Sequence, residues 1–321
     1  MSEVKAKSRG NKEVVTKKPF NMSYIRRYWQ LYALLVLPVV YLIMFKYVPM
    51  WYVLIAFKKY SIVQKIWEMP WAKNHGFEYF IKAFKTPDFR TSLKNTIWLN
   101  LLDLVVGFPV PIIFALILNE LRFKFFKKTV QTIAYMPHFL SWVIIYGLAI
   151  QVFAPTTGLI NILVQNLGFE PIPFLNEGHH WVRTYIGLGI WQSFGWNSII
   201  YLAAIAGISP ELYEAASVDG AGRFSKMWHI TLPGIKPTII VLLIMALGNI
   251  IGSGFDRPFA LQNNLVMKNA EVIATYVYKA GIKGSQFSLT TAVGLFQSVV
   301  GVIFLLLANW LARKFGERGL W

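Results

Sequence analysis

The sequence predicts an all-α integral membrane protein with six transmembrane helices and both termini in the cytoplasm. Of its 321 residues, 55% are hydrophobic and 15% are charged, whereas roughly 25% are charged in soluble domains. The mean hydropathy is +0.47. Six apolar stretches have about the 17 to 25 residues that a membrane-spanning helix needs. This composition argues against a water-soluble enzyme.

Residues 1–29 form a basic cytoplasmic tail with eight Lys and Arg. No apolar run precedes these charges, so we do not interpret the tail as a cleavable signal peptide. The first transmembrane helix is expected within 30–57, and 58–92 is expected to be an extracytoplasmic loop. A core of five helices then occupies 93–312, with a cytoplasmic tail at 313–321. The predicted spans are 31–57, 93–119, 131–153, 184–207, 238–255 and 289–312.

The distribution of basic residues predicts the orientation. With cytoplasmic termini, the inner segments carry 18 Lys and Arg and the outer segments carry 12, as the positive-inside rule requires. The bias is reduced by the 58–92 loop, which is itself rich in lysine. The net charge of +17 is spread between apolar runs and forms no continuous face, so we expect no nucleic-acid partner. There is no Cys, which excludes disulfides and thiolate chemistry.

Residues 208–236, between the fourth and fifth spans, have the pattern of a short helix and a turn. Ser209 is a favourable N-cap, and Pro210 suits the first helical position. Glu211 complements the positive end of a helix dipole, and Gly220 is a natural helix end. The pattern alone also fits an amphipathic connector on the membrane surface.

A second short turn is expected at 223–229. Pro233 and Pro237 should then interrupt the helix, because proline lacks the backbone N–H that a helix interior uses. The fifth span would begin at Thr238.

The order of residues in this segment is more specific than its periodicity. The motif reads Glu214-Ala215-Ala216, Asp219-Gly220-Ala221, Ile230 and Leu232-Pro233. It resembles the EAA loop of the permeases of binding-protein-dependent ABC importers, with Gly220 ten residues before Ile230 as in that family. Weaker matches resemble the carbohydrate branch of these permeases: 46–50, 95–96, 271–278, 291–296 and 319–321.

The resemblance implies the type I importer permease fold in the plasma or inner membrane. It also implies a cytoplasmic 208–236 loop whose helix inserts into an ATPase subunit. The residues that it assigns to ATPase coupling are Glu211, Glu214, Ala215, Ala216, Asp219, Gly220, Ala221, Leu232 and Pro233.

The same resemblance implies several partners. Besides the lipid bilayer, these are a second homologous permease subunit, two ATPase subunits and an extracytoplasmic substrate-binding protein. The chain would form half of the path for a carbohydrate, either an oligosaccharide or a polysaccharide fragment.

No P-loop is present, because 220–222 and 281–284 lack its spacing and its Lys-Ser/Thr end. We therefore expect a transporter subunit that is not an enzyme. It would have no catalytic residue and no bound cofactor or metal, with ATP and Mg used by the partner ATPase.

Polar residues within spans are candidates for the substrate path, because they are costly in lipid unless they face protein or water. In maltose-type permeases the sugar contacts lie in the spans on either side of the EAA loop. The resemblance therefore implies Gln192, Trp196 and Asn249 as first choices.

Asn249 and Ser253 are four residues apart and are expected on one helical face. Gly248 and Gly252 are expected on the adjacent face, as a pair of small residues that allows close helix packing. The full predicted set is Gln192, Trp196, Asn197, Asn249, Ser253 and Phe255. Packing between helices is the alternative role.

Asp103 is the one acid deep within a predicted span. It is either a proton or cation site or, as we favour, a structural partner of another helix or subunit. Asp256 and Arg257 are interpreted as an exposed pair of little energetic weight. His179 and His180 are interpreted as solvated, without an acidic companion, so no metal site is predicted.

Two alternative functions remain open. An importer of the same class could carry another polar solute, such as an amino acid. A self-sufficient transporter driven by ions is the other alternative, and Asp103 and Lys46 would be its starting points. The EAA-like segment argues against an ion-driven carrier, which needs no ATPase docking site.

Overall fold

The computed structural model describes residues 26–252, 254–314, 316 and 319–320. The chain divides into two compact units, Met1–Val53 and Leu54–Trp321. In the first, α2 (Trp29–Leu42) continues through a π-helical turn, η1 (Ile43–Tyr47), into α3 (Val48–Met50). The 3-10 helix η2 (Trp51–Phe57) follows, and the division between the two units falls within it. No residue of α2 is buried, although the helix is almost entirely apolar.

The second unit contains the remaining helices, and its described residues form no β-strand beyond one isolated bridge between Lys58 and Trp71. In chain order the elements are η3 (Asn74–Gly76), α4 (Glu78–Lys85), α5 (Pro87–Leu102), η4 (Asp103–Gly107), α6 (Pro109–Asn119), α7 (Lys124–Tyr135), η5 (Met136–Phe139), α8 (Trp142–Phe153), α9 (Leu159–Asn166), α10 (Gly178–Ala206), α11 (Pro210–Val218), α12 (Arg223–Lys226), η6 (Met227–Thr231), α13 (Leu232–Gly248), α14 (Asp256–Leu261), α15 (Met267–Ala270), α16 (Ile273–Val277), η7 (Tyr278–Lys283) and α17 (Phe287–Lys314).

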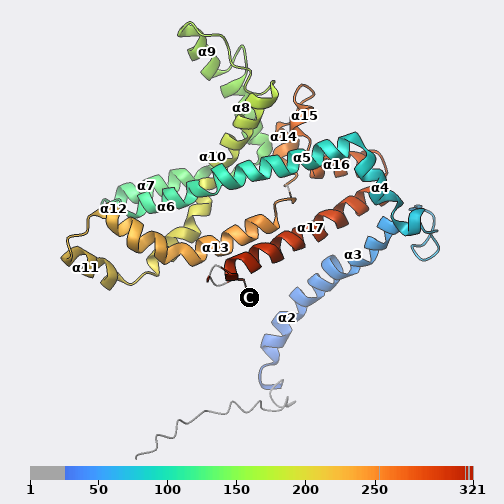
Figure 1. Ribbon diagram of the computed structural model, residues 1–321, viewed down its shortest axis with the longest axis horizontal. Coiled ribbons are helices and arrows are strands. Elements are labelled where there is room, and N and C mark those ends of the chain that lie inside the picture. The colour runs from blue at the N-terminus through green and yellow to red at the C-terminus, as the bar shows by residue number, and fades with distance from the viewer. Residues whose placement is uncertain (1–25, 253, 315, 317–318, 321) are drawn as a thin grey trace, which may run out of the picture. The chain divides into compact units, whose positions relative to one another are not determined.

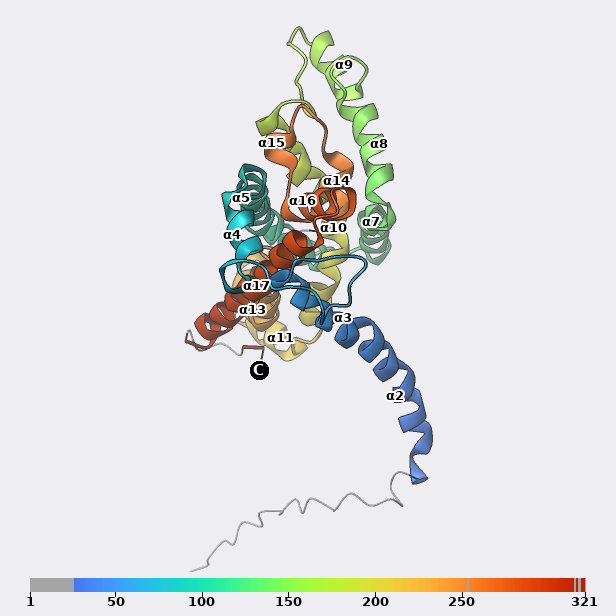
Figure 2. The same cartoon turned by 90° about the vertical axis from the view of Figure 1, so that its right-hand side faces the viewer.

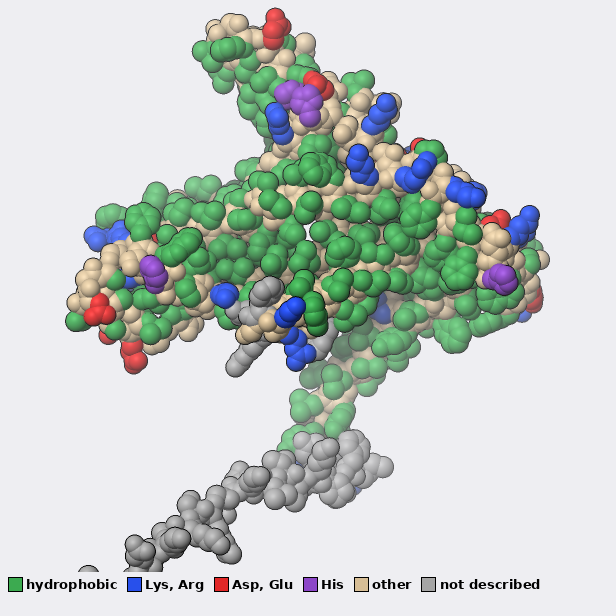
Figure 3. Space-filling view, in the orientation of Figure 1, with side chains coloured by type: hydrophobic (Ala, Val, Ile, Leu, Met, Phe, Trp, Pro, Cys, Tyr) green, Lys and Arg blue, Asp and Glu red, His purple; other side chains and the backbone are tan. Residues whose placement is uncertain are grey.

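Within the described residues, four continuous helices are long and apolar enough to span a membrane: Trp29–Phe57, Pro87–Asn119, Arg223–Gly248 and Phe287–Lys314. Counting two sharply bent helix pairs as one span each raises the number to six. Figure 3 shows hydrophobic side chains covering the middle of α5, α6, α13 and α17, with charged side chains mainly toward the ends of these helices. The all-helical membrane fold is confirmed. The side of the membrane on which the termini lie stays a prediction.

The predicted third span, 131–153, is not one straight helix. The segment Lys124–Phe139 meets Trp142–Phe153 at an angle of 106°. Leu140 and Ser141 are extended at this junction, and the Ser141 hydroxyl accepts a hydrogen bond from the Ile144 N–H at 3.4 Å to start α8. The hydropathy of the segment is continuous, so only the backbone reveals the bend.

Three of the prolines that lie inside spans without ending them follow a π-helical turn. The π-helical turns η1, η4 and η6 each end two residues before a proline, namely Pro49, Pro109 and Pro233. A proline ring clashes with the carbonyl four residues earlier and cannot donate to it, and a widened turn relieves this conflict.

The prediction that Pro233 and Pro237 interrupt the helix was therefore wrong. The helix runs unbroken from Arg223 to Gly248. The fifth span begins earlier in the chain than predicted, and it also ends earlier, at Gly248 instead of Phe255.

The second unit has three hydrophobic clusters in which distant helices meet. Phe89, Ile273 and Val293 belong to one, and Leu99, Trp181 and Leu261 belong to another; Ala115, Tyr201 and Ile235 belong to the third. The long helix α10 packs against α6 and α13, and α13 packs along α17 (Figure 1). Helix α15 packs against α10 (Figure 2), and Trp181 Nε1 of α10 donates to the Leu261 carbonyl of α14 at 2.8 Å. These contacts hold the second, fourth and fifth spans around the polar cavity described below, and the sixth span packs against the fifth.

Candidate functional site

The EAA-like segment forms a short, well-terminated helix, as predicted. Helix α11 begins with Pro210 at its first position, although the Ser209 side chain makes no capping hydrogen bond. Gly220 ends the helix with a φ of +76°, a conformation that favours glycine. The Ala221 N–H donates to the Ala216 carbonyl at 2.8 Å, which completes the cap.

Two side-chain contacts attach α11 to the start of the fifth span. The Tyr213 and Thr231 hydroxyls lie 3.0 Å apart and share a hydrogen bond. Lys226 Nζ donates to Ser217 Oγ at 2.5 Å. Thr231 is buried and directly precedes Leu232 and Pro233, the last two residues of the motif. A displacement of α11 therefore has a direct mechanical connection to α13.

The outward face of α11 is both acidic and apolar. Glu211, Glu214 and Asp219 are exposed, and the side chains of Leu212 and Val218 are 54% and 89% exposed. Exposed apolar side chains with a polar rim are typical of a protein contact surface. Ala215 and Ala216 lie between these residues, and their small side chains allow another chain to approach the helix closely.

The fifth span ends in a helix break at Asn249. Asn249 is the C-cap of α13, and the Gly252 N–H donates to the Asn249 carbonyl at 2.9 Å as the chain turns away. Asn249 therefore follows the last residue of the helix, and Ser253, with which it was predicted to share a helical face, lies outside the described residues. The predicted pair of Gly248 and Gly252 does not form on one helix, because Gly248 is the last residue of α13 and Gly252 lies beyond its end.

The close helix contact at Gly248 is made with the sixth span instead. A Cβ at Gly301 would lie 3.0 Å from the Gly248 carbonyl oxygen, and a Cβ at Gly248 would meet Leu305 at 2.8 Å. Two small residues from different spans therefore allow α13 and α17 to approach, as small-residue motifs do in membranes.

Amide side chains from two other spans satisfy the carbonyls of the helix break. Asn100 Nδ2 donates to the Ile250 carbonyl at 2.7 Å, and Gln297 Nε2 donates to the Ile251 carbonyl at 2.9 Å. Non-helical backbone at membrane depth is tolerated only where such groups are satisfied or face water. The amides of Asn100 and Gln297, neither of which is among the predicted path residues, therefore satisfy the backbone at the break.

A polar cavity of about 420 Å³ lies beside the break, between the second, fourth and fifth spans. Its polar lining comprises Asn100, Asp103, Ser193, Asn197, Tyr201, Asn249 and Arg257. Asn249 also lines a second cavity of about 460 Å³ on the side of α17. Of the predicted path residues, Asn197 and Asn249 are thus brought to one cavity, whose lining also includes the aromatic residues Phe108 and Tyr201.

The other predicted path residues lie elsewhere. Gln192 Nε2 donates to the His138 carbonyl at 3.3 Å, and the Trp196 ring stacks on the His138 ring with centroids 4.6 Å apart. Both side chains therefore face η5, not the cavity. Phe255 stacks on Phe259, with centroids 4.6 Å apart, in an aromatic cluster beyond the helix break.

The acid of the second span has a partner from the segment after the break. Arg257 Nη1 donates to Asp103 Oδ2 at 2.7 Å, and Nη2 donates to Oδ1 at 3.3 Å and to the Tyr185 carbonyl at 2.5 Å. The guanidinium carbon lies 3.7 Å from the centre of the Tyr185 ring. This network supports the structural role of Asp103. The interpretation of Arg257 as an exposed, weakly interacting residue was wrong, because only 15% of its side chain is exposed.

One further prediction needs correction. His179 does have an acidic companion: its Nδ1 lies 3.1 Å from Glu177 Oε1. With His180, these residues place their potential ligand atoms within 4.8 Å of one another. The backbone turn at the start of α10 brings Glu177 back to His179, which sequence spacing alone did not suggest. The His179 and Glu177 side chains are 60% and 49% exposed, typical of a solvated pair.

Comparison with known proteins gives consistent matches. Residues 101–317 match the family model described as "Binding-protein-dependent transport system inner membrane component". Protein LplB of Bacillus subtilis is 46% identical over 300 residues, covering 93% of each chain. The polygalacturonan/rhamnogalacturonan transport system permease protein YteP of the same organism is 48% identical over 293 residues, covering 91% of this chain and 90% of the relative.

Two solved structures have the same architecture. One is a bacterial ABC transporter involved in the import of the acidic polysaccharide alginate, with a TM-score of 0.83 and 40% sequence identity over 91% of this chain and 98% of the other. The second is a bacterial alginate ABC transporter in complex with a periplasmic protein that carries an alginate pentasaccharide. Its TM-score is 0.84, at 39% identity over 93% of this chain and 99% of the other.

Proposed function

Because the chain belongs to the family of inner membrane components of binding-protein-dependent transport systems, we propose that it is the permease subunit of an ABC importer for a carbohydrate. It forms half of the translocation path, beside a second homologous permease subunit. An external binding protein delivers the substrate, and two partner subunits hydrolyse ATP with Mg. The observation that carries the proposal is the EAA-like helix α11, exposed on one face and attached to the fifth span on the other.

The mechanism follows from that attachment. When the ATPase subunits close, a contact at Glu214 moves α11 as a rigid lever. The Tyr213–Thr231 hydrogen bond passes this movement to α13, whose far end is the helix break at Asn249. Rocking of α13 against α10 and α17 changes access to the cavities on both sides of Asn249.

The chemistry of the cavity supports a carbohydrate. Sugars present many hydroxyls and flat C–H faces, so they are bound by amides and hydroxyls beside aromatic rings. Asn197, Asn249 and Ser193 supply the polar groups, and Phe108 and Tyr201 supply the rings. Relatives named for polygalacturonan/rhamnogalacturonan and arabinooligosaccharides favour an oligosaccharide over an amino acid. In the proposed path, Gln192, Trp196 and Phe255 contribute to the wall formed with the second permease subunit.

Co-purification and ATP hydrolysis test the coupling role. Glu214→Lys is compared with Glu170→Lys, a charge reversal at another exposed acid far along the chain from α11. We expect Glu214→Lys to weaken recovery of the ATPase subunits and to abolish substrate-stimulated ATP hydrolysis, and the control to change neither. Normal assembly and stimulation in Glu214→Lys would contradict the role of this residue.

Uptake measurements test the path. Asn197→Ala and Asn249→Ala should each lower uptake of oligosaccharide at least tenfold while the complex still assembles, whereas Asn166→Ala, at the exposed end of α9, should not. A panel of neutral and uronic-acid oligosaccharides, read by stimulation of ATP hydrolysis, identifies the substrate class. Loss of assembly would show that these amides serve packing and not transport.

A further inference from the structure

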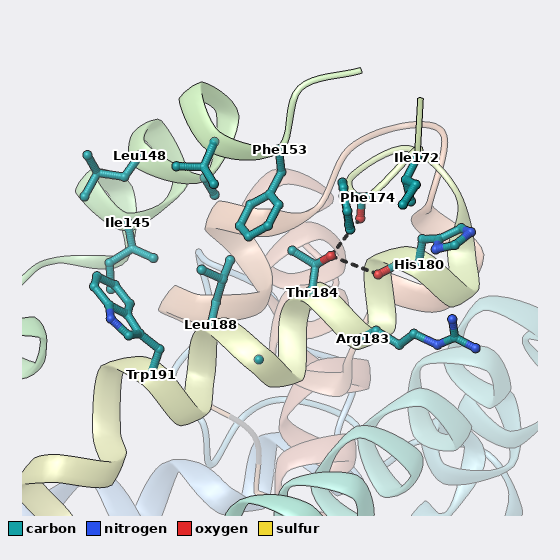
Figure 4. A pocket seen from close by; sticks show the side chains of 13 residues that line it. Ile145, Leu148, Phe153, Ile172, Phe174, His180, Arg183, Thr184, Leu188 and Trp191 are labelled. Atoms are coloured by element: carbon teal, nitrogen blue, oxygen red, sulfur yellow. Dashed lines mark hydrogen bonds between the residues drawn. The ribbon is translucent and has the colours of Figure 1, made fainter. Parts of the chain in front are cut away.

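A third, chemically different cavity lies between α8 and α10. It has a volume of about 690 Å³, and apart from three residues at one end its lining is apolar. Figure 4 shows Ile145, Leu148 and Trp191 at one end of this groove and His180 and Arg183 at the other. The groove belongs neither to the helix break nor to α11, so neither proposed role of the chain accounts for it.

The groove offers almost no hydrogen-bonding groups to a ligand. The one lining hydroxyl, on Thr184, already donates to the Phe174 carbonyl at 3.1 Å and the His180 carbonyl at 3.0 Å (Figure 4). A sugar bound here would leave its buried hydroxyls without hydrogen-bond partners, which is unfavourable. The lining therefore selects an apolar chain.

The polar end of the groove carries an available positive charge. Arg183 is exposed, forms no salt bridge with a described residue, and no acidic side chain lines the groove. The carboxylate of Glu177 is engaged by His179. An anionic group, and above all a phosphate, is the natural partner of such a guanidinium.

The spacing of these two features matches one leaflet of a bilayer. Arg183 directly precedes the predicted fourth span, where lipid phosphates lie, and Trp191 follows eight residues later on the same helix. At 1.5 Å per residue the distance along α10 is about 12 Å, close to half of the roughly 30 Å hydrocarbon core.

We propose that this groove binds an anionic phospholipid, with one acyl chain along α8 and α10 and its phosphate against Arg183. His180 lies at the same end and adds a hydrogen-bond donor to the headgroup. The groove selects this lipid because Arg183 and part of the apolar lining lie on the same helix, α10, at a fixed spacing.

Native mass spectrometry of the purified transporter, in nanodiscs of phosphatidylglycerol and phosphatidylcholine mixed equally, tests the proposal. We expect phosphatidylglycerol to be retained in preference to phosphatidylcholine. Arg183→Gln should lower that preference about tenfold, the effect of losing one charge-assisted hydrogen bond. Arg122→Gln, at an exposed arginine after the second span, serves as the matched control and should leave the preference unchanged.

A second variant fills the groove itself. Gly187 lines the cavity, and a Cβ there meets nothing within 4 Å, so Gly187→Trp should fold while its indole occupies the acyl site. Gly147→Trp, at another open glycine on α8 outside the lining, is the control. Bound lipid should be lost only in Gly187→Trp, with the unfolding temperature of both variants unchanged.

Three results would overturn the proposal. They are equal retention of the two lipids by the wild-type protein, unchanged retention in Gly187→Trp, and cross-links from a photoreactive residue at 148 that reach a partner permease helix and no lipid. The third result would assign the groove to a protein interface.

Discussion

Arg257 and Asp103 are separated by 154 residues, yet they form a two-pronged ion pair with N–O distances of 2.7 and 3.3 Å. The pair connects the π-helical turn of the second span to the segment beyond the helix break in the fifth. It also lines the polar cavity. The pair therefore sets the position of the break relative to the second span.

Removing one partner of this pair should destabilise the protein more than removing both. Loss of one member of a fully buried pair costs about 3–5 kcal/mol, because an uncompensated charge remains. With 31% of Asp103 exposed, we expect about 2 kcal/mol for Arg257→Gln or Asp103→Asn. The free energy of unfolding in detergent measures this loss of stability. The double variant should recover much of the lost stability. A double variant destabilised by the sum of the two single losses would contradict the pairing.

Gly189 is expected to be essential for the same pair. A Cβ at this position would overlap the Arg257 guanidinium, whereas a Cβ at Gly187, two residues earlier on α10, meets nothing. Gly189→Val should therefore lower the unfolding temperature and transport, and Gly187→Val should leave both unchanged. Similar stability of the two variants would show that Arg257 does not occupy this position.

The two amides at the helix break should be needed as hydrogen-bond donors. Gln297→Leu leaves the Ile251 carbonyl without its donor, and Asn100→Leu does the same at Ile250. Each unsatisfied buried carbonyl should cost about 1–3 kcal/mol, measured by unfolding in detergent. Gln286→Leu, at an exposed glutamine, is the control. A loss of stability no larger than that of the control would mean that water donates hydrogen bonds to these carbonyls equally well.

The hydroxyl contact between α11 and the fifth span should couple ATP hydrolysis to transport. Tyr213→Phe and Thr231→Val each remove one half of the contact and leave the outward face of α11 intact. We expect assembly with the ATPase to persist while the sugar transported per ATP falls. In the double variant the losses should not add, because both changes remove one interaction. Additive losses would place the two residues in separate roles.

The predicted orientation is testable with single cysteines, since the chain has none of its own. Val63 and Phe125 are 93% and 85% exposed and lie in segments predicted to be outside and inside the cell. A membrane-impermeant maleimide should label Val63→Cys in intact cells. It should label Phe125→Cys only after permeabilisation, and the reverse pattern would invert the topology.

Features encoded by neighbouring residues were predictable from the sequence. The membrane spans follow from local hydropathy, and α11 follows from Pro210, the EAA-like motif and Gly220, all within one short segment. Their physical causes, namely burial in lipid, helix initiation and the left-handed cap, act over a few residues. The location of the coupling helix therefore needed no tertiary information.

The tertiary structure alone decided how the polar residues inside the membrane are used. Hydropathy continues past Gly248, so only the packing of α13 against α17 and the amides of Asn100 and Gln297 fix the break there. Gln192 and Asn197 have similar sequence surroundings. Their different positions around the axis of α10 direct Gln192 toward η5 and Asn197 into the cavity. Arg257 looked like a surface residue because its partner, Asp103, lies in a distant span. Buried polar groups are satisfied by contacts between remote segments, and those contacts exist only once the chain has folded.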